Sequence, residues 1–452
     1  MEKLIDTFSE KAKQYLESIS SREVYPSPEH IKNLKAFDIP LQNNPIEPLE
    51  VLNELDTYGS PATVASSGNR YFGFVIGGTL PAPLSANLLA GVWDQNAGME
   101  SSSPVSSFLE SVCRKWLIDI LKLPEETEVG FVTGATMANF TGLAAARHTL
   151  LKKLGWDVEN EGLFNAPEIQ VIVGEEVHVS VLKALSMLGL GRNRIIRVPV
   201  DSQGRMKSDA IPKKDPSPRI ICVQAGNVNT GAFDPIDEIC ETASSENTWV
   251  HVDGAFGLWA AASQKYKHLV KGIQKADSWA TDAHKWLNVP YDSGIVFVKE
   301  KDHLISSMAT NASYLIVGTK REPLNYVPEI SRRSRGIEVW AALRSMGKKG
   351  LSHLIESNCE KAALFANILS SAGYKVINDV VLNQVLVSFG DRDTTNSVIQ
   401  RVQEDGTCWC GGTEWQGKTA MRISVSSWRT SKKDIEDSTK VIIKIANDKN
   451  RK

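Results

Sequence analysis

The sequence predicts an α/β protein whose large domain holds a mostly parallel seven-stranded sheet, followed by a smaller C-terminal α+β domain. Two observations support this fold class. Between residues 128 and 299, short runs rich in β-branched residues alternate with segments that carry apolar residues at helical spacing. This alternation is typical of a parallel sheet covered by helices. After residue 335, long helical patterns surround a few isolated strand-like runs, so a second, smaller unit is expected there.

The seven expected strands are short and apolar, as buried strands of a parallel sheet are. They are VGFV (129–132), IQVIV (169–173), RIIRVPV (194–200), RIICVQA (219–225), TWVHVD (248–253), SWATD (278–282) and GIVFV (294–298). Helices are expected between them, at residues 138–155, 178–190 and 235–246. Because ligands of such sheets bind beyond the carboxyl ends of the strands, functional residues are expected directly after these runs.

The segments on either side of this region complete the expected organisation. Apolar residues from Leu4 to Ile19 recur near a helical period, which predicts an amphipathic helix, and a stretch rich in Pro, Asn and Ser follows. With so little core of its own, the segment 1–65 either packs on another subunit or wraps the main domain. The large domain is then expected at 66–335 and the small domain at 336–452.

Composition narrows the classes of function. The chain has 452 residues and a formal net charge of −2. Its sequence has no stripe of basic residues of the kind that binds a nucleic acid. No apolar run approaches the roughly 18 residues that span a bilayer, and the N-terminus lacks a secretory pattern. The six sparse cysteines fit a reducing cytoplasm. Cys408 and Cys410 have no second ligand pair nearby, so no metal site is expected.

Three features near the ends of the expected strands are candidates for a chemical role. TGATMAN (133–139) is a small-residue turn that opens a helix, and the free N–H groups there suit a phosphate. Asp253 ends an apolar run, where a buried carboxylate needs a cationic partner; a structural salt bridge or a helix cap is the alternative interpretation. His178 precedes an expected helix, where a capping or surface role is common for histidine.

Lys285 is the fourth feature. It lies in TDAHKWLNVPYDSG beside Trp286 and Leu287, an apolar place for an ammonium group, and a desolvated lysine is a nucleophile toward carbonyl carbons. Together the four features match an aldehyde cofactor that carries a phosphate and a pyridine ring. Lys285 would form the Schiff base, Asp253 would face the ring nitrogen, the turn would hold the phosphate, and His178 would stack on the ring.

HVDGAFG followed by TDAHKWLNVPYDSG resembles the pyridoxal-phosphate-dependent group II amino-acid decarboxylases, which include the aromatic-amino-acid, glutamate and cysteine-sulfinate enzymes. NRYFGFVIGG, SSSPVSSFLE, GAFDPI and SRRSRGIEVWAALRSMGKKG each resemble a further segment of that family. The resemblance implies the type I fold of pyridoxal-phosphate enzymes, pyridoxal 5′-phosphate as cofactor, and decarboxylation of an L-amino acid to its amine. It also implies a homodimer with active sites at the subunit interface.

The resemblance also implies roles for individual residues around the cofactor. Lys285 would hold the cofactor as an internal aldimine, and Asp253 would keep the pyridine nitrogen protonated. Ala255 would pack under the ring, and His178 would stack over it. The residues implied to hold the phosphate are Gly134, Ala135 and Thr136, with help from His284.

For the substrate, the resemblance implies that Tyr326 protonates the carbanion after carbon dioxide leaves. Arg422 would bind the substrate carboxylate, with a structural ion pair as the alternative. Two departures from the family occur. Asn227 stands where the family has a threonine, so it is expected to replace a hydroxyl near the cofactor. Phe74 and the glycines around it stand where known members have other residues, so Phe74 is a candidate substrate contact, and the substrate stays open.

Four alternatives share part of this evidence. An aldehyde synthase, a carbon–carbon lyase or an aminotransferase would use the same lysine and aspartate, and a binding protein without activity would need neither. The complete set of cofactor residues disfavours the last. The presence of both Tyr326 and His178 favours decarboxylation over aldehyde synthesis.

Overall fold

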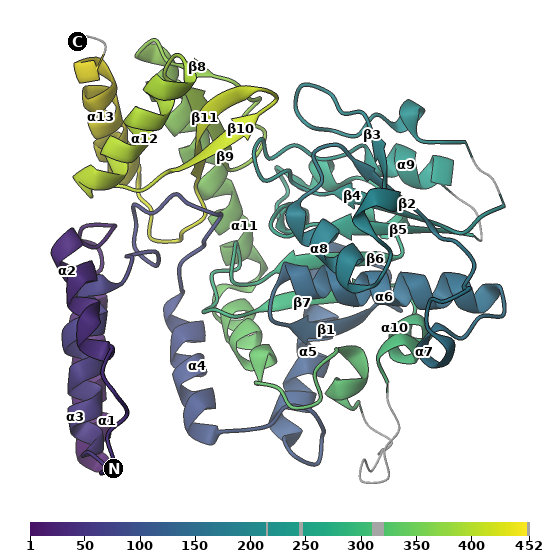
Figure 1. Cartoon of the computed structure of the whole chain (residues 1–452), viewed down its shortest axis with the longest axis horizontal. Helices are drawn as coiled ribbons and strands as arrows, with labels where there is room; N and C mark the ends of the chain where they lie inside the picture. The colour runs from purple at the N-terminus through teal and green to yellow at the C-terminus, as the bar shows by residue number, and fades with distance from the viewer. Residues whose placement is uncertain (214–215, 244–246, 310–320, 450–452) are drawn as a thin grey trace.

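The computed structural model describes residues 1–213, 216–243, 247–309 and 321–449. Three parts are visible in Figure 1: an N-terminal helical arm along one side, a large body built on one sheet, and a C-terminal unit with a smaller sheet. The arm contains α1 (Glu2–Ser18), α2 (Pro28–Asn33) and α3 (Pro48–Glu54). It leads through α4 (Pro81–Trp93) into the body.

The large sheet has seven strands in the order β1-β7-β6-β5-β4-β2-β3. Neighbours from β6 to β3 run parallel, whereas β7 is antiparallel to both β1 and β6. The strands are β1 (Glu128–Val132), β2 (Gln170–Gly174), β3 (Ile196–Val198), β4 (Arg219–Gln224), β5 (Thr248–Asp253), β6 (Ser278–Asp282) and β7 (Gly294–Val298). Each predicted run supplies one strand, which confirms the mostly parallel seven-stranded sheet.

Both faces of this sheet are buried, because side chains alternate along each strand. In β4, Ile221 and Val223 belong to a core shared with α5 and α11, while Ile220 and Cys222 belong to a second core shared with α6 and α8. The helices of the body are α5 (Pro104–Leu121), α6 (Ala135–Lys153), α7 (Val158–Glu161), α8 (Val179–Met187), α9 (Ile236–Ala243), α10 (Lys301–Met308) and α11 (Arg335–Ser371). The sheet is therefore enclosed, and only the ends of its strands can meet a ligand.

The C-terminal unit has a four-stranded antiparallel sheet in the order β10-β11-β9-β8. Its elements are β8 (Lys375–Val376), β9 (Gln384–Ser388), α12 (Arg392–Asp405), β10 (Gly411–Trp415), β11 (Lys418–Ser424) and α13 (Lys432–Lys449). Cys408 and Cys410 are both buried in its apolar core. This unit confirms the smaller α+β part, while the domain limits at 65 and 335 stay predictions. The long helix α11 contributes Val339 to the large core and Phe365 to the small one.

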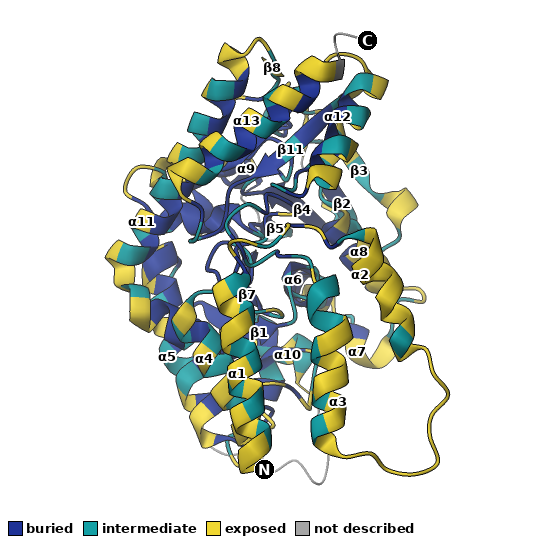
Figure 2. Cartoon of the chain, turned by 90° about the vertical axis from the view of Figure 1, so that its left-hand side faces the viewer, coloured by how far each residue is buried: buried dark blue, intermediate teal, exposed yellow. Residues whose placement is uncertain are grey.

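The N-terminal arm is largely exposed, as the yellow and teal colouring of α1 and α3 in Figure 2 shows. None of the residues in α1, α2 or α3 is buried. Within the arm, Lys11 of α1 pairs with Asp56 at 2.7 Å. Apolar side chains are exposed along the arm and the neighbouring α4, namely Ile5, Phe8, Leu16, Val51, Leu88, Leu89, Val92 and Trp93. A surface of this kind is typical of a subunit interface.

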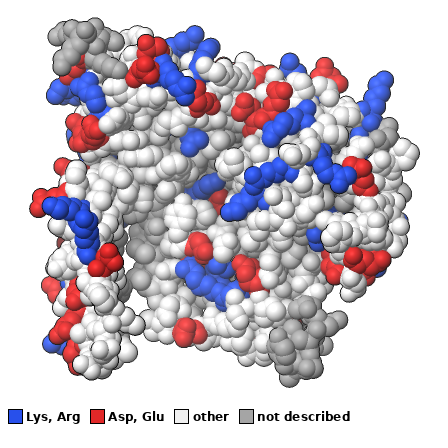
Figure 3. Space-filling view, viewed as in Figure 1, with Lys and Arg blue, Asp and Glu red and all other residues white. Residues whose placement is uncertain are grey.

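Two general surface properties accompany this fold. Acidic and basic side chains are interspersed over the face seen in Figure 3. Among the helices that the structure describes, none is long and apolar enough to cross a membrane.

Candidate active site

The functional side chains gather where the central strands end. Asp253 is the last residue of β5, and Lys285 follows the end of β6 by three residues. These two strands are parallel neighbours, with Asp253 opposite Ala280. Gly134 and His178 stand after β1 and β2, each directly before a helix. Segments far apart in sequence are thus brought to one edge of the sheet, as expected for this type of fold.

Asp253 is 4% exposed and is held by three hydrogen-bond donors. Its Oδ1 accepts from the Ala255 backbone N–H at 3.2 Å. Its Oδ2 accepts from Asn139 Nδ2 at 3.3 Å and from Ser180 Oγ at 3.4 Å. The expected cationic partner is absent among the described residues, and these neutral donors take its place.

Lys285 lies beside a second buried carboxylate. Its Nζ is 3.0 Å from Asp282 Oδ2, and the lysine side chain is 17% exposed. The next two residues, Trp286 and Leu287, are fully buried. The loop before α4 also contacts this segment, because a Cβ added at Gly77 would lie 1.7 Å from the Lys285 carbonyl oxygen. Lys285 therefore stands at the site with its ammonium group paired and its backbone enclosed.

The N-terminus of α6 forms the opposite wall of the site. The N-cap residue is Gly134, so no side chain caps the helix there. The Ala135 N–H donates to Asp282 Oδ1 at 2.5 Å. His284 Nε2 lies 3.5 Å from the same oxygen, and Thr136 is half-buried in the first turn. A helix N-terminus suits an anion, and the Asp282 carboxylate lies at this one.

His178 has the capping role that the sequence offered, while its stacking on a cofactor ring stays a prediction. It caps α8, because its Nδ1 accepts from the Ser180 N–H at 3.2 Å. Burial is the main cause that lowers the pKa of His178, with Asp253 opposing the shift and Lys285 and Arg422 adding to it. The ring therefore shares its surroundings with these three charged groups. Since Nδ1 accepts a backbone N–H, the neutral ring carries its proton on Nε2.

Arg422 of β11 brings a buried cation from the small unit. Its Nη1 donates to Asn229 Oδ1 at 3.4 Å, and burial lowers the pKa of its guanidinium. In the described part of the chain no carboxylate pairs with it. Arg422 therefore does not form the structural ion pair that was the alternative. Its guanidinium is available for an anionic ligand.

Phe74 lies in the loop that passes over Lys285. Its side chain is 57% exposed, and its φ of 52° places it in the left-handed region together with Val75 at 60°. Such φ values are rare for residues other than glycine and often occur at functional sites. The Phe74 ring lies 5.4 Å from that of Trp409, which in turn stacks on Tyr71 at 4.9 Å. The loop therefore carries an aromatic group.

Two further predicted residues are held by contacts within the protein. Tyr326 is 4% exposed in the core beside β1, and the Arg321 guanidinium lies 3.6 Å from the centre of its ring. The ring is thus packed in the core, and the proton-transfer role of Tyr326 stays a prediction. Asn227 uses its Oδ1 to accept from the Asn229 and Thr230 N–H groups. It stabilises its own turn, and its place near the cofactor stays a prediction.

Several residues at the site were not predicted. Asp282 pairs with Lys285, and Asn139 and Ser180 hold Asp253. Behind them, His251 Nε2 lies 2.8 Å from Asn139 Oδ1. One signal was present in the sequence: His251 and Asp253 are two residues apart in β5, so their side chains lie on the same face of the sheet.

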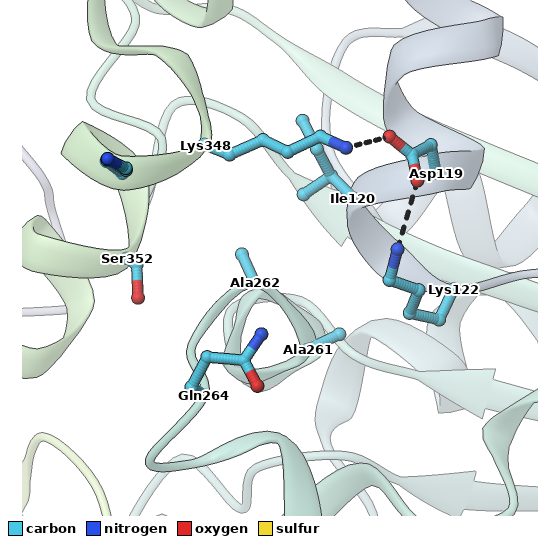
Figure 4. Close-up of a pocket in the computed structure, with 9 residues that line it drawn as sticks. Asp119, Ile120, Lys122, Ala261, Ala262, Gln264, Lys348 and Ser352 are labelled. Carbon is cyan, nitrogen blue, oxygen red and sulfur yellow. Dashed lines mark hydrogen bonds and ion pairs between the residues drawn. The ribbon is translucent and has the colours of Figure 1, made fainter.

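A separate surface cavity of about 220 Å³ lies between α5 and α11 and includes none of these residues. Figure 4 shows Lys348 and Lys122 both directed toward Asp119 at its rim. The Lys122 Nζ is 3.0 Å from that carboxylate, and Lys348 pairs with its other oxygen. Its charged groups are exposed and already paired, so this cavity is not the candidate active site.

The residues at the sheet edge fit a pyridoxal cofactor. The chemistry requires an amine for the aldehyde, a stable carboxylate for the ring nitrogen and an anion site for the phosphate. Lys285, Asp253 and the α6 N-terminus supply these three from adjoining elements. A mostly parallel sheet that presents them together, with a smaller C-terminal unit beside it, is the architecture of type I pyridoxal-phosphate enzymes, and this chain has that architecture.

The comparison with protein families identifies the family. The pyridoxal-dependent decarboxylase conserved domain matches residues 28–390. The chain therefore belongs to the pyridoxal-dependent decarboxylase family, its cofactor is pyridoxal 5′-phosphate, and its class is that of the carboxy-lyases. It is 27% identical over 385 residues to an aromatic-L-amino-acid decarboxylase of Bacillus atrophaeus, which covers 79% of this chain and 75% of the relative.

Solved structures with low sequence identity share the fold. An Oryza sativa TDC with PLP and tryptamine superposes with a TM-score of 0.89 at 19% identity, covering 99% of this chain and 97% of that one. A Rhodiola rosea 4-hydroxyphenylacetaldehyde synthase superposes with a TM-score of 0.83 at 20% identity, covering 99% and 98%. At these identities the likeness establishes the fold and leaves the substrate and product open.

Proposed function

We propose that the chain removes carbon dioxide from an L-amino acid and releases the corresponding amine. The observation that carries this proposal is the arrangement of Lys285 and Asp253 at the ends of adjacent strands, opposite the α6 N-terminus. When bound, pyridoxal phosphate supplies an electron sink for the electron pair left by departing carbon dioxide. The chain's own residues then have to bind and orient the substrate and to supply the proton that replaces carbon dioxide.

Lys285 and Asp253 have distinct tasks in this proposal. Lys285 provides the amine that holds the cofactor, and its Nζ lies 3.0 Å from Asp282 Oδ2. Asp253 accepts three hydrogen bonds, which fix the carboxylate that would face the pyridine nitrogen. His178 is proposed to cover the ring, and Ala255, half-buried two residues after Asp253, is proposed to pack beneath it. The phosphate is assigned to the turn from Gly134 to Thr136, beside His284.

Arg422 is proposed to bind a carboxylate of the substrate. A guanidinium favours carboxylates because it can donate two parallel hydrogen bonds. Its partial burial strengthens such a pair, since less water competes for it. Phe74 is proposed to contact the substrate side chain from the loop above Lys285. An α-carboxylate and an acidic side chain both satisfy Arg422, so the substrate panel has to contain both neutral and acidic amino acids.

A second outcome, oxidative conversion to an aldehyde, is favoured by one observation. Tyr326 is packed beneath Arg321, so within the described ranges this tyrosine does not bring to the site the hydroxyl that would favour protonation over oxidation. In that outcome an amino acid, O₂ and water give an aldehyde, carbon dioxide, ammonia and hydrogen peroxide. O₂ accepts the two electrons that decarboxylation would otherwise leave on the product. A neighbour in the fold comparison is an aldehyde synthase.

The experiment is a panel of the twenty common amino acids with dihydroxyphenylalanine, diaminobutyrate and cysteine sulfinate, scored for carbon dioxide, amine, aldehyde and hydrogen peroxide. Carbon dioxide with an equal amount of amine supports decarboxylation, and aldehyde with peroxide supports the second outcome. Lys285→Ala should abolish both. Lys433→Ala is the matched control, because that lysine side chain is 80% exposed. Activity that survives Lys285→Ala would refute the role of Lys285.

We further propose that the chain forms a homodimer in the cytoplasm, with the N-terminal arm at the interface. The exposed apolar side chains of α1 and α4 support this, because a face of such composition is costly in water. Sedimentation equilibrium should give twice the 49.7 kDa chain mass. A mass equal to one chain at micromolar concentration would contradict the dimer.

A further inference from the structure

A buried chain of hydrogen bonds leads from the core of the sheet to Asp253. Trp249 Nε1 donates to Ser278 Oγ at 2.8 Å, and Ser278 Oγ lies 2.7 Å from His251 Nδ1. His251 Nε2 lies 2.8 Å from Asn139 Oδ1. Asn139 Nδ2 then donates to Asp253 Oδ2 at 3.3 Å. None of the roles proposed above uses the residues behind Asp253.

The chemistry of the two ends fixes the direction of every bond in this chain. An indole N–H can only donate, so Ser278 Oγ accepts from Trp249 and keeps its own proton available for His251 Nδ1. The proton of His251 is therefore on Nε2, where it donates to Asn139 Oδ1. An ionised carboxylate can only accept, which places the amide nitrogen of Asn139 toward Asp253. Reversing the Asn139 amide would set its oxygen against the carboxylate and leave His251 without an acceptor.

The surroundings leave these groups little freedom. Ser278, His251 and Asn139 are all fully buried. Burial lowers the pKa of His251 to about 3, so its ring is neutral, as the hydrogen-bond directions require. The α6 backbone lies close to the ring at Gly142, where an added Cβ would be 3.0 Å from His251 Cε1. The amide nitrogen of Asn139 also donates to Ser180 Oγ at 3.2 Å, which links the chain to the residue that His178 contacts.

We propose that His251 and Asn139 are positioning residues, which orient the carboxylate of Asp253 toward the pyridine nitrogen of the cofactor. The inference rests on the role given to Asp253 under the proposed function. His251 contacts neither cofactor nor substrate. Its Nε2–H donates to the side-chain oxygen of Asn139 and so fixes the orientation of that amide. The amide nitrogen in turn orients the carboxylate of Asp253.

The test compares two replacements of His251 in the holoenzyme without substrate. His251→Gln keeps an N–H donor near the position of Nε2, and His251→Leu removes it while keeping a side chain of similar bulk. We expect His251→Leu to raise the dissociation constant of pyridoxal phosphate about tenfold, the factor for roughly one charge-assisted hydrogen bond. The visible absorbance band of the bound cofactor should change with it. His251→Gln should stay close to wild type in both measurements.

Equal cofactor binding and equal absorbance in the two variants would overturn the proposal. A role in packing alone would not depend on a hydrogen-bond donor, which glutamine has and leucine lacks. If His251→Leu does not fold, Gly142→Ala takes its place, since the added methyl displaces the ring without removing a polar group. Its control is Gly91→Ala in α4, where an added Cβ meets nothing within 4 Å. Cofactor binding weaker in Gly142→Ala than in this control supports the relay, and equal binding overturns it. Failure of the proposed function would instead appear as wild type that binds the cofactor and releases no carbon dioxide.

Discussion

Replacing Arg332 tests how firmly the end of β1, and with it the turn proposed for the phosphate, is held. Arg332 Nη1 lies 2.6 Å from Glu110 Oε1, and the two side chains are 0% and 1% exposed. The same guanidinium donates to the carbonyl oxygens of Ala97 at 3.0 Å and Phe131 at 2.7 Å. Phe131 belongs to β1, three residues before Gly134. Arg332 thus fixes three segments around one buried charge pair.

The size of the effect follows from what the replacement leaves behind. Arg332→Met leaves the Glu110 carboxylate buried without a cation, and loss of one partner of a buried pair costs roughly 3–5 kcal/mol. With a urea m-value of roughly 3 kcal/mol/M or more for a chain of this size, the unfolding midpoint should fall by about 1 M. The double variant Arg332→Met/Glu110→Leu removes both charges and should recover most of this loss.

The assay is urea unfolding of the cofactor-free protein, followed by tryptophan fluorescence at one protein concentration. Lys433→Met is the matched control, because its partner Asp437 is 46% exposed and surface pairs contribute only about 0–1 kcal/mol. The reasoning is refuted if Arg332→Met loses less than about 1 kcal/mol, or if the double variant is no more stable than the single one.

Three further predictions concern the site itself. Asp282→Asn keeps an acceptor for the Ala135 N–H but removes a negative charge beside the proposed phosphate position. The dissociation constant of pyridoxal phosphate, measured by fluorescence titration, should therefore fall about tenfold; a rise would show that the carboxylate aids binding. Tyr326→Phe should leave the ratio of amine to aldehyde unchanged because the ring is packed beneath Arg321, and a shift toward aldehyde would place its hydroxyl at the reaction. Arg422→Met should raise the KM of the best substrate about tenfold in steady-state kinetics, and an unchanged KM would exclude carboxylate binding.

The fold could be predicted because its signals are local. Each strand of the large sheet is a short run of β-branched residues, and the requirement that both faces be buried makes these runs apolar throughout. Lys285 and Asp253 were found for a related reason: a charged side chain at the end of such a run is unusual enough to notice. The order of the strands was not accessible, since pairing of β1 with β7 joins segments that are far apart in the sequence.

The residues that escaped prediction depend on contacts that no local pattern encodes. Asn139 is one polar residue in a helix, and only the packing of α6 against β5 places it on Asp253. The packing of the Tyr326 ring beneath the Arg321 guanidinium could not be predicted, because a position along the chain says nothing about the direction of its side chain. Asn227 satisfies its own turn, a use of asparagine that is common in loops.

The close approach at Gly77 restricts how new specificities can be built on this scaffold. Since a methyl group there would lie 1.7 Å from the backbone oxygen of Lys285, variation at position 77 damages the reactive lysine before it can reshape any binding surface. Position 74, three residues earlier, has an exposed side chain and no such contact. A mutant library aimed at other amino acids should therefore keep the glycine invariant and diversify the phenylalanine.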